Sequence, residues 1–523
     1  MGRARMTALA AATAALLPFT VSAQEGAPPG KDTYDRWCAT CHGAEGAGDG
    51  AGAEWMLPRP RDFTTGLYQV RTTLSGELPT DADIRRVIDE GMPGTTMPGW
   101  AERLSQRERD ELVDYVKSFS RFFGQGDPPE PIDVGRAPGI DDEGLAEGRE
   151  FYERIECNRC HGEEGRGDGP SAPTLEDDFD RPVRAADLTE NWRFNGGGSV
   201  EEIFMRLRTG LNGTPMPGFS DLIDAEFMTE AQLWNVAHYV RSLAPERPPA
   251  VTEVIGAPRV EEGASLPSGP DDEAWAAVPA FRIPMAGQII VSPRWFQPRV
   301  TGLWVQALHD DTELALRVSW SDPSESPDPA WTEWKEKFVP MMAPGEGEPI
   351  DPAASLPDRL VVQFPPEIPD GMDRPYFLMG DARTPVYLWD WEAGRGVTEA
   401  EARGIGTAAP QESPSAVAAQ ARWEAGEWAV VFRRSLITED DQDLPFAVDR
   451  AVPIAFSAWD GDSGEAGPRR AISSWYFIFL EPATPATVFV APLMATLLTA
   501  GLGLMVVARA QKRERESLAP GES

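Results

Sequence analysis

The sequence has few cysteines and few basic residues for its length. Four cysteines stand among 523 residues, and 84 aspartates and glutamates outnumber 48 lysines and arginines, which gives a net charge of −36. A surface this acidic repels phosphate backbones, so nucleic acid is excluded as a partner. Hydrophobic residues make up 41% and charged residues 25%, which excludes a polytopic membrane protein and a wholly disordered chain. At ~100–200 residues per domain, the length predicts three or four domains.

Both ends of the chain carry targeting signals. Residues 1–23 are typical of a secretory signal peptide, with two arginines before an apolar stretch and Val21-Ser22-Ala23 as the cleavage site. Residues 482–508 carry no charge and are long enough to cross a bilayer. Segment 509–523 begins with basic residues, which favours the cytoplasmic side for this tail. We therefore expect one C-terminal transmembrane helix in the inner (cytoplasmic) membrane, with the bulk of the chain in the periplasm.

All four cysteines lie in one kind of motif. They occur as Cys38-Ala-Thr-Cys41-His42 and Cys157-Asn-Arg-Cys160-His161, and C-x-x-C-H is the attachment signature of c-type haem. Two thiols three residues apart lie on one side of a helical turn and can add to the two vinyl groups of one porphyrin. The adjacent histidine then ligates the iron. The sequence thus predicts two covalent haem c groups and leaves no cysteine for a disulfide.

The surroundings of each motif repeat after 119 residues. His42–Gly50 matches His161–Gly169 at seven of nine positions. At the same offset stand Met97 and Met216, each in a Met-Pro-Gly sequence and each 55 residues after its histidine. The sixth coordination position of the iron in such haems is usually filled by a methionine or a second histidine. Met97 and Met216 are therefore the predicted axial iron ligands opposite His42 and His161.

Other candidate ligands are few. Met92 is the rival to Met97, but it aligns with Leu211 in the second repeat. His238 lies on the helix that closes the second repeat, and His309 belongs to the C-terminal half. Because two of the four histidines are already used, a multihaem protein with two histidines per iron and a three-histidine metal site are both excluded.

Each repeat ends in a similar amphipathic helix, which contains Asp114–Ser118 in the first and His238–Ser242 in the second. The offset there is 124, so five residues have been inserted near Leu222–Phe227. The pattern resembles the class I cytochrome c fold, in which an N-terminal and a C-terminal helix cross and a methionine loop covers the haem. This resemblance implies all-α cytochrome c domains at 24–123 and 143–246. Residues 124–142 between them are rich in proline, glycine and acid and predict a linker.

The composition and the spacing of apolar residues change in the C-terminal half. Residues 247–271 are rich in proline, glycine and acid and predict a second linker. Beyond them apolar residues alternate, as in Leu303–Ala307 and Leu314–Trp320, which predicts a hairpin with one buried face. Further short strands separated by polar turns predict an antiparallel β-sandwich over 272–481. We expect 321–357 to be a long, partly disordered insertion.

Several short segments of this region resemble the haem-b-binding γ subunits of the ethylbenzene dehydrogenase and dimethylsulfide dehydrogenase family. They include Ala307–Asp311, Tyr376–Asp381, Val386–Trp391 and Ser473–Tyr476. The resemblance implies a β-sandwich that holds one non-covalent haem b between a methionine and a lysine and that serves a periplasmic molybdenum enzyme. Met379 is then the methionine ligand.

The lysine that the resemblance implies is missing. Shortly before Ser473 the chain has Arg469 and Arg470, and a protonated guanidinium has no lone pair to give to iron. The lysines of this region are Lys335 and Lys337, both in the expected insertion. Three alternatives stay open: one of these lysines folds back, His309 takes its place, or the site holds no haem b.

Two six-coordinate irons leave no open position for a substrate, which favours electron transfer. The leading interpretation is a membrane-anchored periplasmic dihaem cytochrome c, with its haem domains on flexible linkers. It would relay electrons between the respiratory chain and another cytochrome or a periplasmic, molybdenum-containing oxidoreductase. The alternative is a dihaem enzyme, such as a peroxidase or a sulfur-compound dehydrogenase, in which Met97 or Met216 is displaced. A third interpretation makes the β-sandwich a sugar-binding module.

Overall fold

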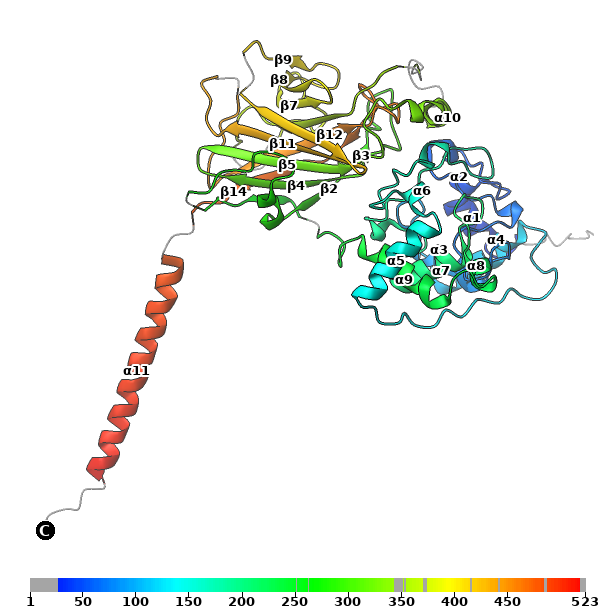
Figure 1. Cartoon of the computed structure of the whole chain (residues 1–523), viewed down its shortest axis with the longest axis horizontal. Helices are drawn as coiled ribbons and strands as arrows, with labels where there is room; N and C mark the ends of the chain where they lie inside the picture. The colour runs from blue at the N-terminus through cyan, green and yellow to red at the C-terminus, as the bar shows by residue number, and fades with distance from the viewer. Residues whose placement is uncertain are drawn as a thin grey trace, which may run out of the picture.

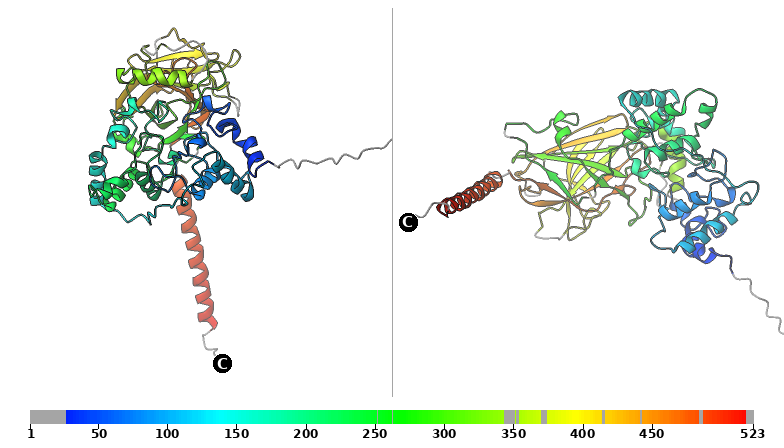
Figure 2. Two further views of the ribbon diagram at one scale, coloured as in Figure 1. Left: turned by 90° about the vertical axis from the view of Figure 1, so that its right-hand side faces the viewer. Right: turned by 90° about the horizontal axis from the view of Figure 1, so that it is seen from below.

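The computed structural model describes residues 27–250, 252–261, 263–342, 351, 354–369, 374–413, 416–440, 443–483 and 487–517. The predicted signal peptide, residues 1–23, lies outside the described residues. A group of helices and a β-sheet region form the body of the molecule, and the long helix α11 projects away from it (Figure 1). The views of Figure 2 show the same separation from two further sides. The predicted fold class, two helical domains followed by an antiparallel β-sandwich and a C-terminal apolar helix, is confirmed.

The two helical repeats have the same order of elements. The first contains α1 (Lys31–Trp37), α2 (Ala39–His42), η1 (Ala53–Trp55), η2 (Phe63–Thr65), α3 (Asp81–Glu90) and α4 (Gln106–Ser118). The second contains α5 (Asp142–Arg154), α6 (Asn158–His161), η3 (Ala172–Thr174), η4 (Asn191–Arg193), α7 (Val200–Thr209), α8 (Ser220–Asp224) and α9 (Glu230–Ser242). The extra helix α8 lies where the change of offset predicts an insertion.

Local sequence sets where the matched helices begin. Thr80 and Ser199 cap α3 and α7 with a side-chain oxygen, and each forms a reciprocal capping box with the residue three positions later. Ser105 and Thr229 do the same for α4 and α9. The first pair of caps is 119 residues apart and the second pair is 124 apart, so the helix starts reproduce both offsets of the repeat.

The first and last helices of each repeat cross at a glycine. A Cβ on Gly30 would lie 2.4 Å from the carbonyl oxygen of Glu111, and one on Gly148 would lie 2.2 Å from that of Asn235. Next to each crossing two tyrosine rings meet edge to face, Tyr34 with Tyr115 and Tyr152 with Tyr239, both at 5.3 Å between centroids. The glycines allow the backbones to approach closely, and this fixes the helix pair that carries each C-x-x-C-H motif.

The C-terminal half is built from two packed sheets. Within the described residues one sheet runs β1-β14-β12-β6-β7-β8-β9, with β13 and β3 at its side, and the other runs β10-β11-β5-β4-β2. All pairs are antiparallel except β1 with β14. The bounds are β1 Val254–Ala257, β2 Phe281–Pro284, β3 Ala286–Gly287, β4 Gly302–His309, β5 Glu313–Ser321, β6 Arg359–Phe364, β7 Val386–Glu392, β8 Gly396–Ala402, β9 Ala409–Pro410, β10 Ala418–Glu424, β11 Glu427–Ser435, β12 Ala451–Trp459, β13 Ala471–Ile472 and β14 Tyr476–Leu480.

The predicted hairpin is confirmed and supplies part of the core. β4 pairs with β5 so that Val305 faces Val318 and Ala307 faces Leu316. These residues join the buried cluster between the sheets, to which the other sheet contributes Trp389 on β7. The alternation of apolar residues along these strands therefore predicts the buried face correctly, because successive side chains on a strand point to opposite faces of the sheet.

Two segments differ from the sequence-based expectation. β1 lies inside 247–271, which we expected to be a linker; it is ordered because it pairs in parallel with the C-terminal strand β14. The expected disordered insertion contains η6 (Pro329–Trp331) and α10 (Thr332–Met342). α10 is ordered because Trp331, Trp334 and Phe338 are buried in an apolar cluster that includes residues of both helical repeats. Figure 1 shows α10 at the junction of the sheets with the helices.

The three domains also pack on one another, which corrects the expectation of haem domains on flexible linkers. Arg71 of the first repeat donates to the carbonyl of Thr209 at 2.7 Å. Arg282 on β2 forms a 2.7 Å ion pair with Glu190 of the second repeat. The expected linker 124–142 also contacts the first repeat, since the Ile132 amide donates to the Thr72 carbonyl. Buried polar contacts of this kind hold the domains in one arrangement.

The helix α11 (Thr487–Ser517) extends beyond the predicted span of 482–508. It enters the segment expected to be a tail because Lys, Arg and Glu also favour helix, so the end of the apolar stretch is not the end of the helix. Among the described residues, Val490–Ser517 is the one helix long and apolar enough to cross a membrane. Its apolar side chains are exposed, as Leu498 at 64% and Leu504 at 71% illustrate.

Candidate haem sites

In the first repeat, α2 carries the motif histidine and a following loop orients it. The Nδ1 atom of His42 lies 3.1 Å from the carbonyl oxygen of Arg61. A carbonyl can only accept, so Nδ1 carries the proton and the Nε2 lone pair is left for a metal. Cys38 and Cys41 are free thiols on the same turn. Met97 follows α3 and is packed against the domain core together with Cys38.

The second repeat builds the same arrangement. His161 on α6 has its Nδ1 atom 2.9 Å from the carbonyl oxygen of Ala186, and Cys157 and Cys160 are again free thiols. Met216 packs against the core of this domain together with Cys157. In both repeats a tyrosine hydroxyl, from Tyr34 in the first and Tyr152 in the second, donates to the carbonyl of the glycine after the histidine.

The two methionine loops, Met92–Met97 and Leu211–Met216, contain matching hydrogen bonds. The amide of Met92 donates to the carbonyl of Met97 at 3.0 Å, and the amide of Leu211 donates to the carbonyl of Met216 at 3.0 Å. A threonine hydroxyl between them accepts from the methionine amide in each loop. The alignment of Met92 with Leu211 is therefore confirmed, and it leaves Met97 and Met216 as the predicted ligands.

Burial gives the predicted ligands the protonation states that the chemistry needs. It lowers the pKa of His42 and of His161, so both imidazoles are neutral and can donate a lone pair. It also raises the pKa of Cys38 and of Cys157 to about 12, so these thiols are neutral before they react.

A cavity of about 1260 Å³ opens over the second site. Its wall includes Cys157, Cys160, His161 and Met216, and it is larger than the ~300–1,000 Å³ of an ordinary ligand pocket. The methionine loop of the first repeat reaches this wall through Gly94–Thr96, and the β-sandwich reaches it through Met285–Gly287 and other residues. The second site therefore lies where all three domains meet.

Both helical domains contain buried hydrogen-bond donors without acceptors, which fits the carboxylates of a porphyrin. In the part of the chain that the structure describes, Tyr68 Oη and Trp100 Nε1 of the first repeat have no hydrogen-bond acceptor, and neither do N–H groups of Arg184 and Arg206 in the second. Donors without acceptors are costly in a protein interior. The two carboxylates of a haem would supply acceptors in each site.

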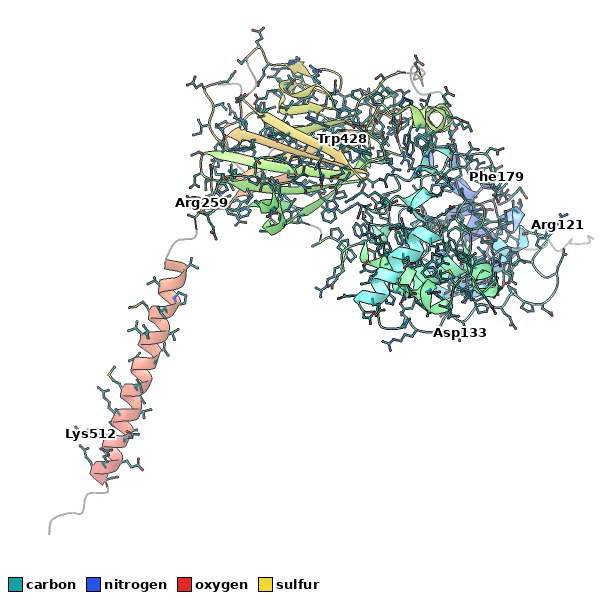
Figure 3. The ribbon with its side chains drawn as sticks, viewed as in Figure 1. Arg121, Asp133, Phe179, Arg259, Trp428 and Lys512 are labelled. Carbon is teal, nitrogen blue, oxygen red and sulfur yellow. The ribbon has the colours of Figure 1, made fainter. Side chains whose placement is uncertain are left out.

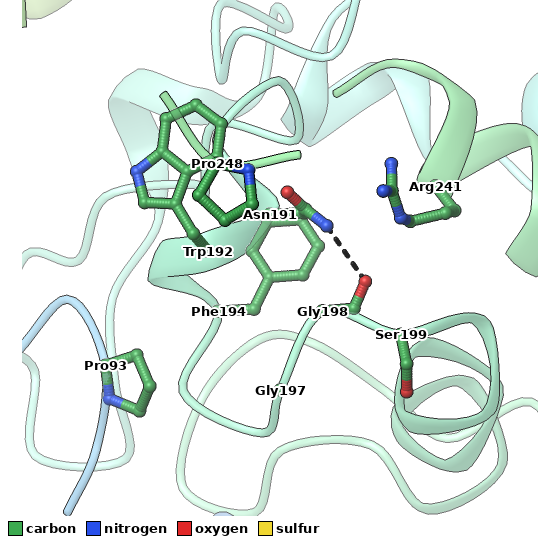
Figure 4. Close-up of a pocket in the computed structure, with 9 residues that line it drawn as sticks. All are labelled: Pro93, Asn191, Trp192, Phe194, Gly197, Gly198, Ser199, Arg241 and Pro248. Carbon is green, nitrogen blue, oxygen red and sulfur yellow. Dashed lines mark hydrogen bonds between the residues drawn. The ribbon is translucent and has the colours of Figure 1, made fainter. Parts of the chain in front are cut away.

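A smaller cavity of about 430 Å³ lies beside the second site (Figure 4). It is bounded by Pro93 of the first methionine loop and by the turn Asn191–Ser199, in which the Asn191 side-chain amide donates to the Gly198 carbonyl at 3.0 Å. None of the predicted haem ligands belongs to its wall.

Met379 in the β-sandwich is buried, with 2% of the residue's surface exposed, and its backbone has a positive φ of 63°. Its sulfur accepts a hydrogen bond from Arg470 Nη1 at 2.9 Å. The Arg470 guanidinium also lies over the ring of Trp459, 4.4 Å from the centroid. An arginine from the stretch of sequence where the resemblance implies a lysine thus already donates to the Met379 sulfur.

The three other nitrogen candidates are engaged elsewhere. His309 uses both ring nitrogens, Nε2 with the Glu481 carbonyl at 2.9 Å and Nδ1 with the Asp311 amide at 3.2 Å. Lys335 donates to the Ala354 carbonyl, and Lys337 pairs with Glu176 of the second helical repeat. Among the described residues, the Met/Lys ligand pair is therefore incomplete.

Comparison with known proteins agrees with this division of the chain. Residues 25–116 match the family "Cytochrome C oxidase, cbb3-type, subunit III", residues 145–244 match the cytochrome c family, and residues 272–406 match the ethylbenzene dehydrogenase family. The chain carries two cytochrome c domains and one ethylbenzene dehydrogenase-like domain. The third match fits a haem b in the β-sandwich, and the matched residues include Met379 but not Arg470.

Proteins that match about half of this chain are named as subunits or members of redox complexes. The chain is 29% identical to the "Putative respiratory nitrate reductase heme subunit ORF7" of Haloferax mediterranei, over 47% of this chain and 81% of that protein. It is 25% identical to the dimethylsulfide dehydrogenase subunit gamma of Rhodovulum sulfidophilum, over 52% of this chain and 99% of that protein. In the Kuenenia stuttgartiensis reducing HAO-like protein complex, a chain is 45% identical over 42% of this chain and 96% of its own length, with a TM-score of 0.39.

The β-sandwich also holds an acid cluster that the sequence did not reveal. Asp322, Asp358 and Asp460 are buried, and their carboxylate oxygens lie within 4.8 Å of one another. Each residue adjoins a strand end, after β5, before β6 and after β12 respectively. Three carboxylates are the kind of ligand set that hard cations take, but all three already accept hydrogen bonds from the protein. Burial and the neighbouring Asp460 raise the pKa of Asp358 to about 7.

The methionine assignments predict how the irons respond to carbon monoxide. The two haem c groups of the reduced wild-type protein should bind none, because both of their sixth positions are closed by a thioether. Met97→Ala and Met216→Ala should each create one binding site per chain, measured by absorbance difference spectra. Met92→Ala is the matched control and should create none. Binding by the wild-type protein, or by Met92→Ala, would contradict the assignment and favour the dihaem enzyme.

The acid cluster predicts that stability falls as pH rises. Because the pKa of Asp358 is about 7 when folded and near 3.8 in an unfolded chain, the folded state binds more protons between these values and is stabilised at the acid end. The Asp358→Asn variant lacks this titration. Between pH 5 and pH 8 its free energy of unfolding should therefore rise by ~1–3 kcal/mol relative to that of the wild-type protein. Urea denaturation at each pH measures this, with the exposed Glu412→Gln as control. A difference that does not change with pH would show that the Asp358 carboxyl is not the group that titrates.

Proposed function

We propose that this protein is a membrane-anchored electron-transfer subunit that carries electrons between the respiratory chain and a periplasmic oxidoreductase of the molybdenum class. The observation that carries the proposal is the position of the second haem site, whose wall is shared by the first methionine loop and the β-sandwich. Electrons tunnel efficiently only between cofactors that lie close together, and this packing brings the haem-binding domains into contact. The subunit names of the relatives support the same role.

The two helical domains supply carriers rather than catalysts. A haem held by histidine and methionine exchanges one electron and presents no open coordination position to a substrate. The protein's part is to orient His42 and His161 through the carbonyls of Arg61 and Ala186 and to keep both imidazoles neutral by burial. It also holds each methionine in a loop that is braced by its own backbone hydrogen bonds.

The contacts between the domains make the relay a fixed one. Gly94 of the first methionine loop packs so closely on the second domain that a Cβ there would lie 2.5 Å from the carbonyl oxygen of Arg193. Arg193 in turn forms a hydrogen bond with Thr301 of the β-sandwich. Neighbouring contacts therefore link the first methionine loop, the second haem cavity and the β-sandwich without a mobile connection.

The anchor and the surface charge support the placement in the cell. α11 presents apolar side chains outward along its length, and its last turns carry basic residues such as Lys512 (Figure 3). We assign these turns to the cytoplasmic side and the haem domains to the periplasmic side. The net charge of −36 favours a redox partner with a basic docking patch.

Electron transfer from the reduced, full-length protein tests this function. Oxidation by a basic cytochrome c should be fast at ~0.01 M salt and about tenfold slower at ~0.15 M, because salt screens the attraction. Ferricyanide, a small anion, serves as the matched control, and its rate should rise with salt. Stopped-flow absorbance of the haems measures both rates. A failure to reduce the cytochrome, or a rapid turnover of hydrogen peroxide by the reduced protein, would contradict the proposal.

A further inference from the structure

One helix of the β-sandwich contacts the same part of both haem domains. α10 packs against η1 of the first repeat and against η3 of the second. η1 starts at Ala53 and η3 at Ala172, which is the 119-residue offset of the repeat. The apolar cluster around α10 also includes Leu57 of the first repeat. A helix outside the two haem domains, at the junction seen in Figure 1, thus meets both of them at equivalent places.

The carbonyl that orients each haem histidine belongs to a loop that follows these short helices. His42 bonds to the carbonyl of Arg61 and His161 to that of Ala186, so the offset between the two acceptors is 125. The aspartate after each acceptor confirms this alignment, because its side chain accepts from the amide two positions later, at 2.8 Å in the first loop and at 2.9 Å in the second. The two loops therefore correspond position by position.

Two positions before each acceptor stands an arginine, Arg59 in the first loop and Arg184 in the second. Nη2 of Arg59 donates to the carbonyl of Met341, near the end of α10, at 3.0 Å. The guanidinium of Arg184 lies over two rings of α10, 4.7 Å from the centroid of Phe338 and 5.7 Å from that of Trp334. Both arginines therefore reach the same helix of the β-sandwich.

Further hydrogen bonds fix the two arginines. Nη1 of Arg59 donates to the carbonyl of Ala53 on η1. Nη1 and Nη2 of Arg184 donate to two carbonyls of the β-sandwich, that of Pro298 at 3.0 Å and that of Gln297 at 3.3 Å. A guanidinium presents several donors in one rigid plane, so one side chain can hold two segments together. Each arginine thus fastens its haem loop to a fixed support.

On the opposite side, each loop packs on the segment that follows the C-x-x-C-H motif. A Cβ on Gly48 would lie 2.5 Å from the carbonyl oxygen of Pro60, and one on Gly167 would lie 2.9 Å from that of Ala185. Pro60 and Ala185 stand between the arginine and the acceptor of each loop. The loop is therefore held between the haem motif on one side and α10 on the other, and the acceptor carbonyl has little freedom to move.

We propose that Arg59 and Arg184 are positioning residues for the two axial histidines and that α10 is the common brace for both loops. Through this brace the β-sandwich sets the strength of the hydrogen bond to Nδ1 in both haem domains. A stronger hydrogen bond makes the imidazole a more basic ligand, which favours oxidised iron. This inference rests on the electron-transfer function proposed above and adds a means by which the β-sandwich controls both carriers.

Arginine-to-lysine substitutions in the full-length protein test the proposal, because they keep the charge and remove the planar guanidinium. Arg59→Lys should weaken the hydrogen bond in the first domain and Arg184→Lys that in the second. At a fixed potential, the ratio of reduced to oxidised haem should rise about threefold in the affected domain, which is ~30 mV for a one-electron couple. Redox titration measures this shift.

Electron paramagnetic resonance of the oxidised protein gives a second readout. The g values of a low-spin haem depend on the orientation of the imidazole plane, and they should change for the same haem whose potential shifts. A loss of stability alone would not change them in molecules that remain folded. Met216→Ala assigns the signals, because the signal altered in that variant belongs to the second haem.

Two further variants separate positioning from other roles of these arginines. Phe338→Ala leaves every charge in place and removes a ring under Arg184, so it should shift the second haem in the same direction as Arg184→Lys. A direct contact between Arg184, which also lines the second cavity, and the haem predicts no such shift. Arg181→Lys is the matched control in the same loop. Its guanidinium lies over the exposed ring of Phe179, and it should shift neither haem.

Three results would overturn the inference. The first is two bound haems with unshifted potentials and g values in both Arg59→Lys and Arg184→Lys. The second is a shift in Arg181→Lys as large as that in Arg184→Lys, and the third is a second haem that Phe338→Ala leaves unchanged. Each of them leaves the electron-transfer function standing, because that function is tested separately by the reduction of a basic cytochrome c.

Discussion

A single hydrogen bond in each helical domain, from Nδ1 of the motif histidine to a backbone carbonyl, is the constraint around which the rest is arranged. It directs Nε2 of His42 and His161 toward the iron position, while burial lowers the pKa of each imidazole and keeps it neutral. The crossing helices carry the motif to this carbonyl, and the glycines at their crossing allow the approach. The methionine loop then closes the opposite side.

The second constraint is electrostatic, because the outside and the inside of this protein have opposite character. The outside is acidic, which suits docking to a basic partner. The second haem cavity is lined by arginines that the protein satisfies only in part. One such arginine, Arg206, also ties the two haem domains together through the Arg71 carbonyl.

Sequence was sufficient where the determinants are local or repeated. The C-x-x-C-H spacing, the two offsets and the alternation in β4 and β5 predicted the haem motifs, the repeat and the hairpin because each depends on neighbours along the chain. The sequence did not reveal the acid cluster, whose members Asp322, Asp358 and Asp460 come from three distant strand ends. It also missed β1, which is a strand only because β14 lies beside it. Such features depend on how distant segments meet.

The function as an electron carrier depends on two covalently bound haems. A pyridine haemochrome spectrum of the purified full-length protein, with haem quantified per chain before and after acid–acetone extraction, measures their number. We expect two c-type haems per chain that remain after extraction. One such haem or none would contradict this expectation, because the second cytochrome c domain and the cavity shared by all three domains would then have no carrier.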